Sequence, residues 1–129
     1  MSIRYGYCTN FASSITGPIF FPLLEDILAA GYDYVEFPLM QTAALSDEAF
    51  TVLVRWLEHN GLAADCTCNM FPPSVRLTGP GTDPARVAAY LEPALARLER
   101  LGTKKIVLGS SAARDLPPGT SEEEGYRQV

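Results

Sequence analysis

YVEF at Tyr34–Phe37, with Gly31 before it and Pro38 after it, is the stretch that decides the fold. A short run of aromatic and β-branched residues between two breakers predicts a buried strand. On both sides, apolar residues recur at helical spacing, which predicts one helix over Pro22–Ala30 and another over Asp47–Asn60. A strand enclosed by two helices is typical of a parallel sheet built from βα units.

The same alternation continues along the chain. Three further strands are predicted at Ile3–Cys8, Leu62–Asn69 and Lys105–Gly109, and a long helix precedes the last of them at Pro84–Leu101. The start of a fourth helix is predicted at Ser121–Gln128. With right-handed crossovers, this order predicts one α/β domain over residues 1–129 with a parallel sheet.

The composition argues against several classes of function. The chain has 129 residues, with 15 Asp and Glu against 10 Lys and Arg, and its net charge of −5 disfavours a general nucleic-acid binder. The first residues lack the pattern of a signal peptide, and no run reaches the ~20 apolar residues that cross a bilayer. Three cysteines suit a reducing compartment, so we expect a cytoplasmic protein with no membrane or nucleic-acid partner.

The carboxyl ends of the strands are where functional groups gather in parallel α/β sheets. Glu36 is the most informative residue there, because it is a carboxylate in an otherwise apolar strand. Two interpretations stay open on the residues alone. Glu36 either faces a ligand pocket or is a structural carboxylate paired with a residue such as Arg4.

Four more polar or small residues follow the third and fourth strands. Asn69 either hydrogen-bonds a ligand hydroxyl or holds the turn that follows it. Gly109 and Ser110 offer backbone amides and a hydroxyl to a phosphate or sugar oxygen, and Arg114 follows within reach of an anion. Ordinary turn chemistry explains the same small residues, and without other support it is the favoured interpretation for that loop.

The three cysteines raise the question of a metal. Cys66 and Cys68 share one face of the third strand by alternation, and Cys8 lies on the first strand. The sequence has no CxxC pair and a lone His59, which favours reduced structural thiols over a three-thiolate metal site. A Gly-x-Ser-x-Gly elbow is also absent, so serine-hydrolase chemistry is set aside.

The segments Gly31–Glu36, Asn69–Pro72, Leu77–Gly79 and Val107–Ser110 resemble, in their order and spacing, the sugar phosphate isomerase/epimerase group of xylose-isomerase-like TIM barrels. The resemblance implies a (β/α)8 barrel that isomerises or epimerises sugars, keto acids or polyol derivatives, usually with a divalent metal. In that family the metal ligands, two Glu with an Asp and a His, come from later strands, so no metal ligand or catalytic residue is expected in this chain.

The first-half positions line the family's substrate pocket. By resemblance, the substrate-binding residues expected in this sequence are Glu36, Asn69, Gly109, Ser110 and Arg114. The expected partner is a small sugar or sugar-like molecule.

Length limits what this chain is expected to do. A (β/α)8 barrel needs about 250 residues, so residues 1–129 are expected to form the first half, truncated within the fourth βα unit and inactive by itself. Two alternatives remain. One is a non-catalytic half-barrel that pairs with itself or a partner through its open edges. The other is part of an abasic-site endonuclease, which the net charge of −5 and the single His59 disfavour.

Overall fold

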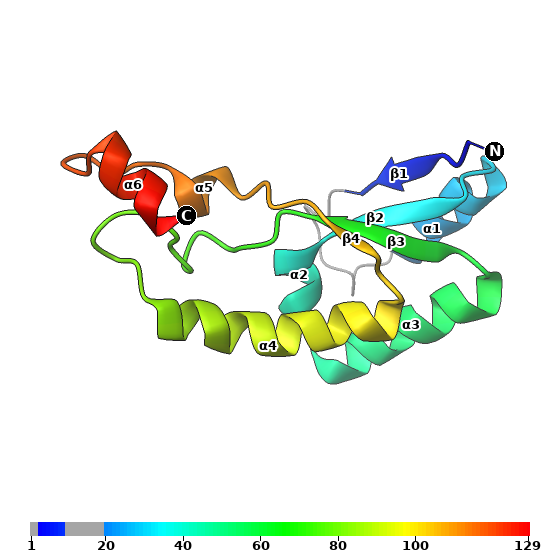
Figure 1. The fold of residues 1–129 in the computed structure, drawn as a ribbon. Helices are drawn as coiled ribbons and strands as arrows, with labels where there is room; N and C mark the ends of the chain where they lie inside the picture. Colours follow the sequence, from blue (N-terminus) through cyan, green and yellow to red (C-terminus); the bar gives the residue numbers. More distant parts are fainter. Residues whose placement is uncertain (1–2, 10–19) are drawn as a thin grey trace.

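Four parallel strands form the sheet in the order β1-β2-β3-β4 (Figure 1). The computed structural model describes residues 3–9 and 20–129. The strands are β1 at Gly6–Cys8, β2 at Tyr34–Pro38, β3 at Ala63–Cys68 and β4 at Lys105–Ile106. Sequential parallel strands joined by helical crossovers are the architecture of half a TIM barrel, so the predicted fold class is confirmed.

Three long helices make the crossovers. They are α1 at Phe20–Ala29, α3 at Asp47–Asn60 and α4 at Pro84–Leu101. Helices α3 and α4 have the bounds that the sequence predicts. Ser46 and Asp83 cap their first turns, and a left-handed glycine follows each last turn. Figure 1 shows α3 and α4 along one side of the sheet.

The main core lies between the sheet and these helices. Val35 and Phe37 of β2 are buried against Leu24 of α1 and Leu53 of α3. Because side chains alternate along a strand, Glu36 points to the opposite face. The helices therefore cover the face that carries the apolar residues of β2 and leave the Glu36 face open.

Two short helices that follow strands were not predicted, and a third one was. Helix α2 at Leu39–Ala43 begins directly after β2, and α5 at Ser111–Arg114 follows the loop after β4. Helix α6 at Glu122–Gln128 is the predicted fourth-helix start. None of the described helices is both long and apolar enough to cross a bilayer.

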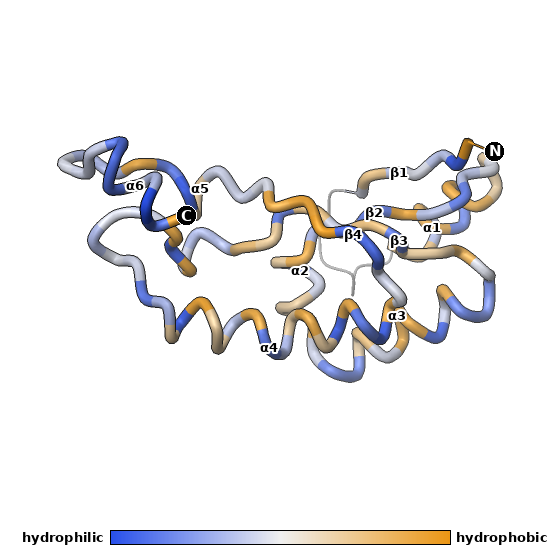
Figure 2. Tube along the Cα trace, in the orientation of Figure 1, coloured by the Kyte–Doolittle hydropathy of each residue, from blue (hydrophilic) through white to orange (hydrophobic). Residues whose placement is uncertain are grey.

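The outer strands are shorter than predicted. β1 begins at Gly6 instead of Ile3, and β4 ends at Ile106 instead of Gly109. β1 and β4 each have a neighbouring strand on only one side. Their regular hydrogen-bonded pairing therefore covers fewer residues than the run of apolar residues in the sequence. Figure 2 shows that the apolar run continues past the end of β4, and Val107 there is 53% exposed.

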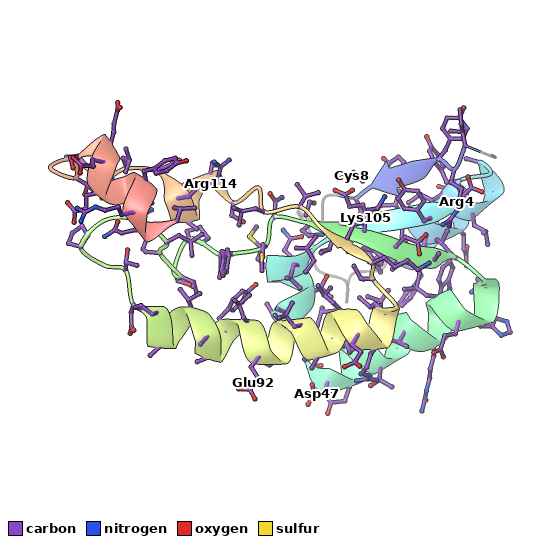
Figure 3. The ribbon with its side chains drawn as sticks, viewed as in Figure 1. Arg4, Cys8, Asp47, Glu92, Lys105 and Arg114 are labelled. Carbon is purple, nitrogen blue, oxygen red and sulfur yellow. The ribbon has the colours of Figure 1, made fainter. Side chains whose placement is uncertain are left out.

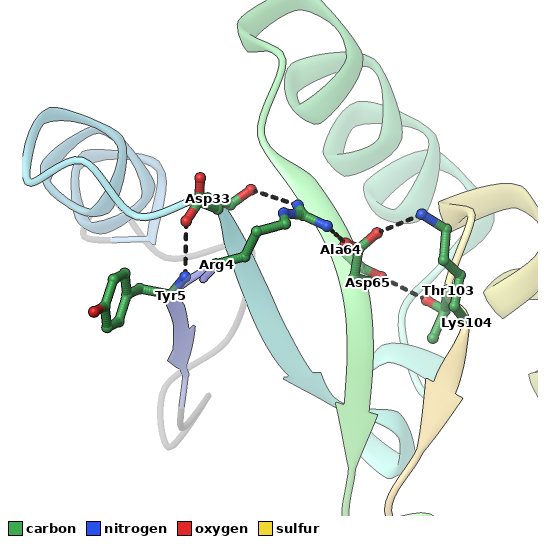
Figure 4. Close-up of polar contacts among 7 residues, drawn as sticks. All are labelled: Arg4, Tyr5, Asp33, Ala64, Asp65, Thr103 and Lys104. Carbon is green, nitrogen blue, oxygen red and sulfur yellow. Dashed lines mark hydrogen bonds and ion pairs between the residues drawn. The ribbon is translucent and has the colours of Figure 1, made fainter. Parts of the chain in front are cut away.

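A network of charged side chains ties the amino-terminal ends of the strands together (Figure 4). The Arg4 guanidinium pairs with the Asp65 carboxylate and donates to the Asp33 carbonyl oxygen at 3.2 Å. The Asp65 carboxylate also pairs with Lys104 at 3.3 Å. Burial alone raises the pKa of Asp65, but hydrogen bonds from Arg4 and Lys104 outweigh it, and the net pKa is lowered.

This network corrects one interpretation of Glu36. The proposed structural pairing of Glu36 with Arg4 is wrong, because Arg4 pairs with Asp65 instead. Distance explains the difference. Glu36 is in register with Cys8, four residues beyond Arg4 along the first strand, which is about 13 Å at ~3.3 Å per residue.

Candidate functional site

Two thiols at the carboxyl ends of β1 and β3 meet a carboxylate in the middle of β2. We call Cys8, Glu36 and Cys68 the thiol–carboxylate cluster. The Cys8 Sγ lies 3.5 Å from Glu36 Oε1 and 3.9 Å from Cys68 Sγ. One ligand atom from each of the three residues lies within 4.8 Å of the others. Cys8 is exposed, and Glu36 and Cys68 are partly buried.

Strand register decides which side chains meet. Cys8 is in register with Glu36, and Cys68 is in register with Pro38, two residues further along β2. All three side chains therefore lie on the sheet face that the helices leave open. Figure 3 shows Cys8 at the end of β1, on the side of the sheet away from α3 and α4.

An irregularity between β2 and β3 is needed for this arrangement. Tyr34 pairs with Ala63, but Glu36 pairs with Cys66, so β3 uses one extra residue over this stretch. Simple alternation from the buried core residue Ala64 would direct Cys68 toward the helices. Because of the extra residue, the side chains of β3 beyond it point to the opposite faces from those that simple alternation gives. Cys68 therefore points to the same face as Glu36.

The cluster has an unfavourable electrostatic environment for ionised thiols. Burial, together with the smaller effects of the nearby Glu36 and Cys8, raises the pKa of Cys68 to about 12. Burial also raises the pKa of Cys8. Within the described residues, the carboxylates that form ion pairs are those of Asp65 and Asp47 only, so no Lys or Arg there forms an ion pair with Glu36.

The loops after β3 and β4 hold each other by hydrogen bonds. The buried Ser110 hydroxyl donates to the Leu108 carbonyl oxygen at 2.7 Å and accepts from the Phe71 amide at 2.8 Å. Ser110 has a φ of 56°, a left-handed conformation that is uncommon for serine. Two hydrogen bonds therefore keep this residue in a strained backbone conformation.

Asn69 and Gly109 lie against each other where these two loops meet. Asn69 has a φ of 46°, and its carbonyl oxygen accepts from the Met40 amide at 3.1 Å. A Cβ on Gly109, whose φ is also 46°, would lie 3.0 Å from Asn69 Oδ1. Among the described residues, none forms a hydrogen bond with the Asn69 side-chain amide.

Arg114 lies apart from the cluster. Figure 3 places it on α5, well separated from Cys8. Its Nε donates to the Gly109 carbonyl oxygen at 2.7 Å. Arg114 also lines a surface hollow with Thr78 and Tyr126. The five expected site residues thus form two groups: Glu36 with the thiols, and Asn69, Gly109, Ser110 and Arg114 around the loops after β3 and β4.

Gln41 is a candidate that the sequence did not single out. It lies in α2, directly after the carboxyl end of β2. Its Oε1 is buried and, among the described residues, accepts no hydrogen bond. A buried acceptor without a donor is costly, so Gln41 is a candidate position for a further hydrogen bond. Only tertiary packing reveals such an atom, because an isolated glutamine carries no sequence signal.

Comparison with solved structures supports the barrel architecture. The chain matches the crystal structure of D-psicose 3-epimerase, determined in the presence of D-fructose, with a TM-score of 0.61 and 18% sequence identity. The match covers 81% of this chain and 36% of the epimerase chain. No protein-family model and no curated protein sequence matches this chain. At this identity, the match shows a shared TIM-barrel fold over about a third of the epimerase.

The divalent metal implied by the family resemblance does not fit the thiol–carboxylate cluster. That metal is expected to have two Glu, an Asp and a His from later strands as ligands. The cluster instead offers two sulfur atoms and one carboxylate from the first three strands. Soft thiolates and hard carboxylates select different metals, so the cluster is not the site of the expected metal.

Proposed function

We propose that this chain forms the first half of a sugar or sugar-phosphate isomerase/epimerase barrel and shapes its substrate pocket. The single observation that carries the proposal is the position of Glu36, a carboxylate of β2 that meets the strand-end thiols of Cys8 and Cys68 on the open sheet face of an epimerase-like fold. Ligands of parallel α/β sheets bind at the carboxyl ends of the strands. The free thiols are compatible with a cytoplasmic location.

Each pocket residue has a role that its surroundings allow. The Glu36 carboxylate accepts hydrogen bonds from sugar hydroxyls, and the Asn69 amide both donates and accepts. The terminal nitrogens of Arg114 are suited to a phosphate or another anionic group. Gly109 and Ser110 shape the wall of the pocket, because Gly109 allows close approach and the Ser110 hydroxyl is already bonded within the loop. These residues bind and orient the substrate.

Sugar binding tests the proposal directly. The chain is titrated with D-fructose and D-psicose while backbone amide NMR shifts are recorded. We expect weak saturable binding, on the order of millimolar, with the shifts centred on the residues around Glu36 and Asn69. E36Q should weaken binding at least fivefold. E92Q is the matched control, because Glu92 is exposed on α4, on the far side from the sheet (Figure 3).

Two results would count against this function. One is saturable shifts that are unchanged by E36Q, and the other is shifts confined to residues away from the strand ends. Turnover is a separate measurement. We expect no interconversion of D-fructose and D-psicose by this chain, because the proposed metal and proton-transfer groups belong to later strands. Turnover by a monodisperse preparation would contradict that expectation.

A second candidate is a half-barrel that pairs with another copy of itself. The outer strands present exposed large apolar residues, namely Tyr5 and Tyr7 at β1 and Ile106, Val107 and Leu108 at β4. Unpaired strand edges with apolar side chains favour association. Sedimentation distinguishes the two candidates: a stable, monodisperse dimer supports self-pairing, whereas aggregation supports an incomplete enzyme.

A further inference from the structure

The thiol–carboxylate cluster has the dimensions of a tetrahedral metal site. With Zn–S bonds of about 2.3 Å and Zn–O bonds of about 2.1 Å, a tetrahedral zinc ion places two sulfur ligands ~3.8 Å apart, and a sulfur and an oxygen ~3.6 Å apart. The observed separations are 3.9 Å between the Cys8 and Cys68 sulfurs and 3.5 Å between Cys8 Sγ and Glu36 Oε1. Little movement is therefore needed to surround an ion.

A disulfide explains the two close thiols less well. β2 lies between β1 and β3, so Cys8 and Cys68 belong to strands that are not neighbours. Two interstrand spacings amount to about 9–10 Å before curvature, whereas a disulfide needs Cα atoms within about 7 Å. Both cysteines are free thiols in the structure. An ion between the sulfurs spans the gap without moving the backbone.

Charge also favours a cation at this position. Glu36 and two ionisable thiols lie together, and within the described residues no Lys or Arg forms an ion pair with Glu36. We propose that Cys8, Glu36 and Cys68 bind a thiophilic divalent cation of the Zn²⁺ type. Two thiolates select Zn²⁺ over Mg²⁺ or Ca²⁺, which prefer oxygen ligands.

The chemistry of binding follows from the ligands. Each thiol forms a metal–sulfur bond and releases its proton to solvent, so about two protons leave per ion bound. The raised pKa values of Cys8 and Cys68 make this displacement dependent on pH, and metal affinity therefore rises as the pH increases. Three protein ligands leave the fourth tetrahedral position to water or another oxygen donor.

Co²⁺ and Zn²⁺ alone test the site in the reduced chain, without any sugar. Co²⁺ titration should produce a sulfur-to-cobalt charge-transfer band that saturates at one ion per chain and disappears on adding Zn²⁺. C8S and C68S should each weaken Zn²⁺ binding by at least ~100-fold. E36Q should retain the band and weaken binding about tenfold. C66S is the matched control, because Cys66 lies on the same strand outside the cluster.

A measurement on the unaltered chain guards against variants that fail to fold. Zn²⁺ should protect Cys8 and Cys68 from alkylation, mapped by mass spectrometry, and leave Cys66 reactive. The proposal is overturned by the absence of a thiolate band, by equal protection of all three cysteines, or by C66S weakening binding as much as C68S. Because no sugar is present, these outcomes are independent of the proposed substrate pocket.

Discussion

Glu36 in the thiol–carboxylate cluster and Ser110 in the loop after β4 are both polar, but they differ in how their hydrogen-bonding groups are satisfied. Ser110 has both a donor and an acceptor partner within the loops. Glu36 has thiols as its side-chain partners among the described residues, and thiols are weak donors. Most buried polar groups in proteins are hydrogen-bonded, so we expect Ser110 to maintain the architecture and Glu36 to be the group that contacts a ligand.

This difference predicts opposite costs for mutations in the two regions. Removing a fully bonded group should destabilise the fold and hardly affect a ligand at the cluster. Removing a poorly bonded group should hardly change the stability of the fold and should weaken the binding of a ligand at the cluster. Three substitutions, in order of decreasing effect on stability, examine this contrast.

S110A should have the largest effect. The change leaves the Phe71 amide without its acceptor in a buried position, and an unsatisfied buried donor costs about 2 kcal/mol. Urea denaturation measures the loss. S111A is the control, because Ser111 is exposed and its side chain has no hydrogen bond to the described residues. Equal stability of S110A and S111A would mean that the Ser110 hydroxyl does not hold the loops together.

Y90F should have an intermediate effect of about 1 kcal/mol, from loss of the hydrogen bond to the Met70 carbonyl oxygen. Burial raises the pKa of Tyr90 to about 12. The unfolded chain therefore loses this proton first, near pH 10, and the contribution of Tyr90 to stability is full below pH 10 and declines as the pH rises toward 12.

Urea denaturation at pH 8 and above pH 10 tests whether the contribution of Tyr90 to stability falls as the pH rises. The stability difference between the unaltered chain and Y90F should shrink at the higher pH. Y126F, which changes an exposed tyrosine, should show no such difference at either pH. A difference that stays constant with pH would contradict the assigned burial of the Tyr90 hydroxyl.

E36Q should have the smallest effect on stability, below about 0.5 kcal/mol, because the carboxylate lacks strong donors in the described part of the chain. The same substitution should weaken sugar and metal binding as described above. Thermal melts of E36Q and the control E92Q should nearly coincide. A loss of more than about 1.5 kcal/mol would place Glu36 among the architectural residues instead.

Much of the fold was predictable because its signals are local. The caps at Ser46 and Asp83 and the glycines at 61 and 102 set the limits of α3 and α4, and the structure confirms both helices. The limits of β1 and β4 were less predictable. Apolar residues continue beyond both strands, but regular pairing depends on neighbours that local sequence does not specify.

The candidate site was predictable only in part. Glu36 stood out because a charge in an apolar strand is costly, and the structure places it on the open face of the sheet. Its closeness to Cys8 and Cys68 was not predicted. Sequence alternation put Cys66 and Cys68 on one face, but it did not indicate that Cys68 alone would join Cys8 and Glu36. Gln41 gave no signal at all.

The sequence by itself determined the order of the strands and of the long helices between them, because hydrophobic period, capping and breakers act over a few residues. Only the tertiary structure decided which functional groups meet. Cys8 and Cys68 are 60 residues apart in sequence, and their contact depends on an extra residue in β3 that changes which face its side chains point to. Such a contact arises from the register of whole strands, and strand register is set by long-range packing.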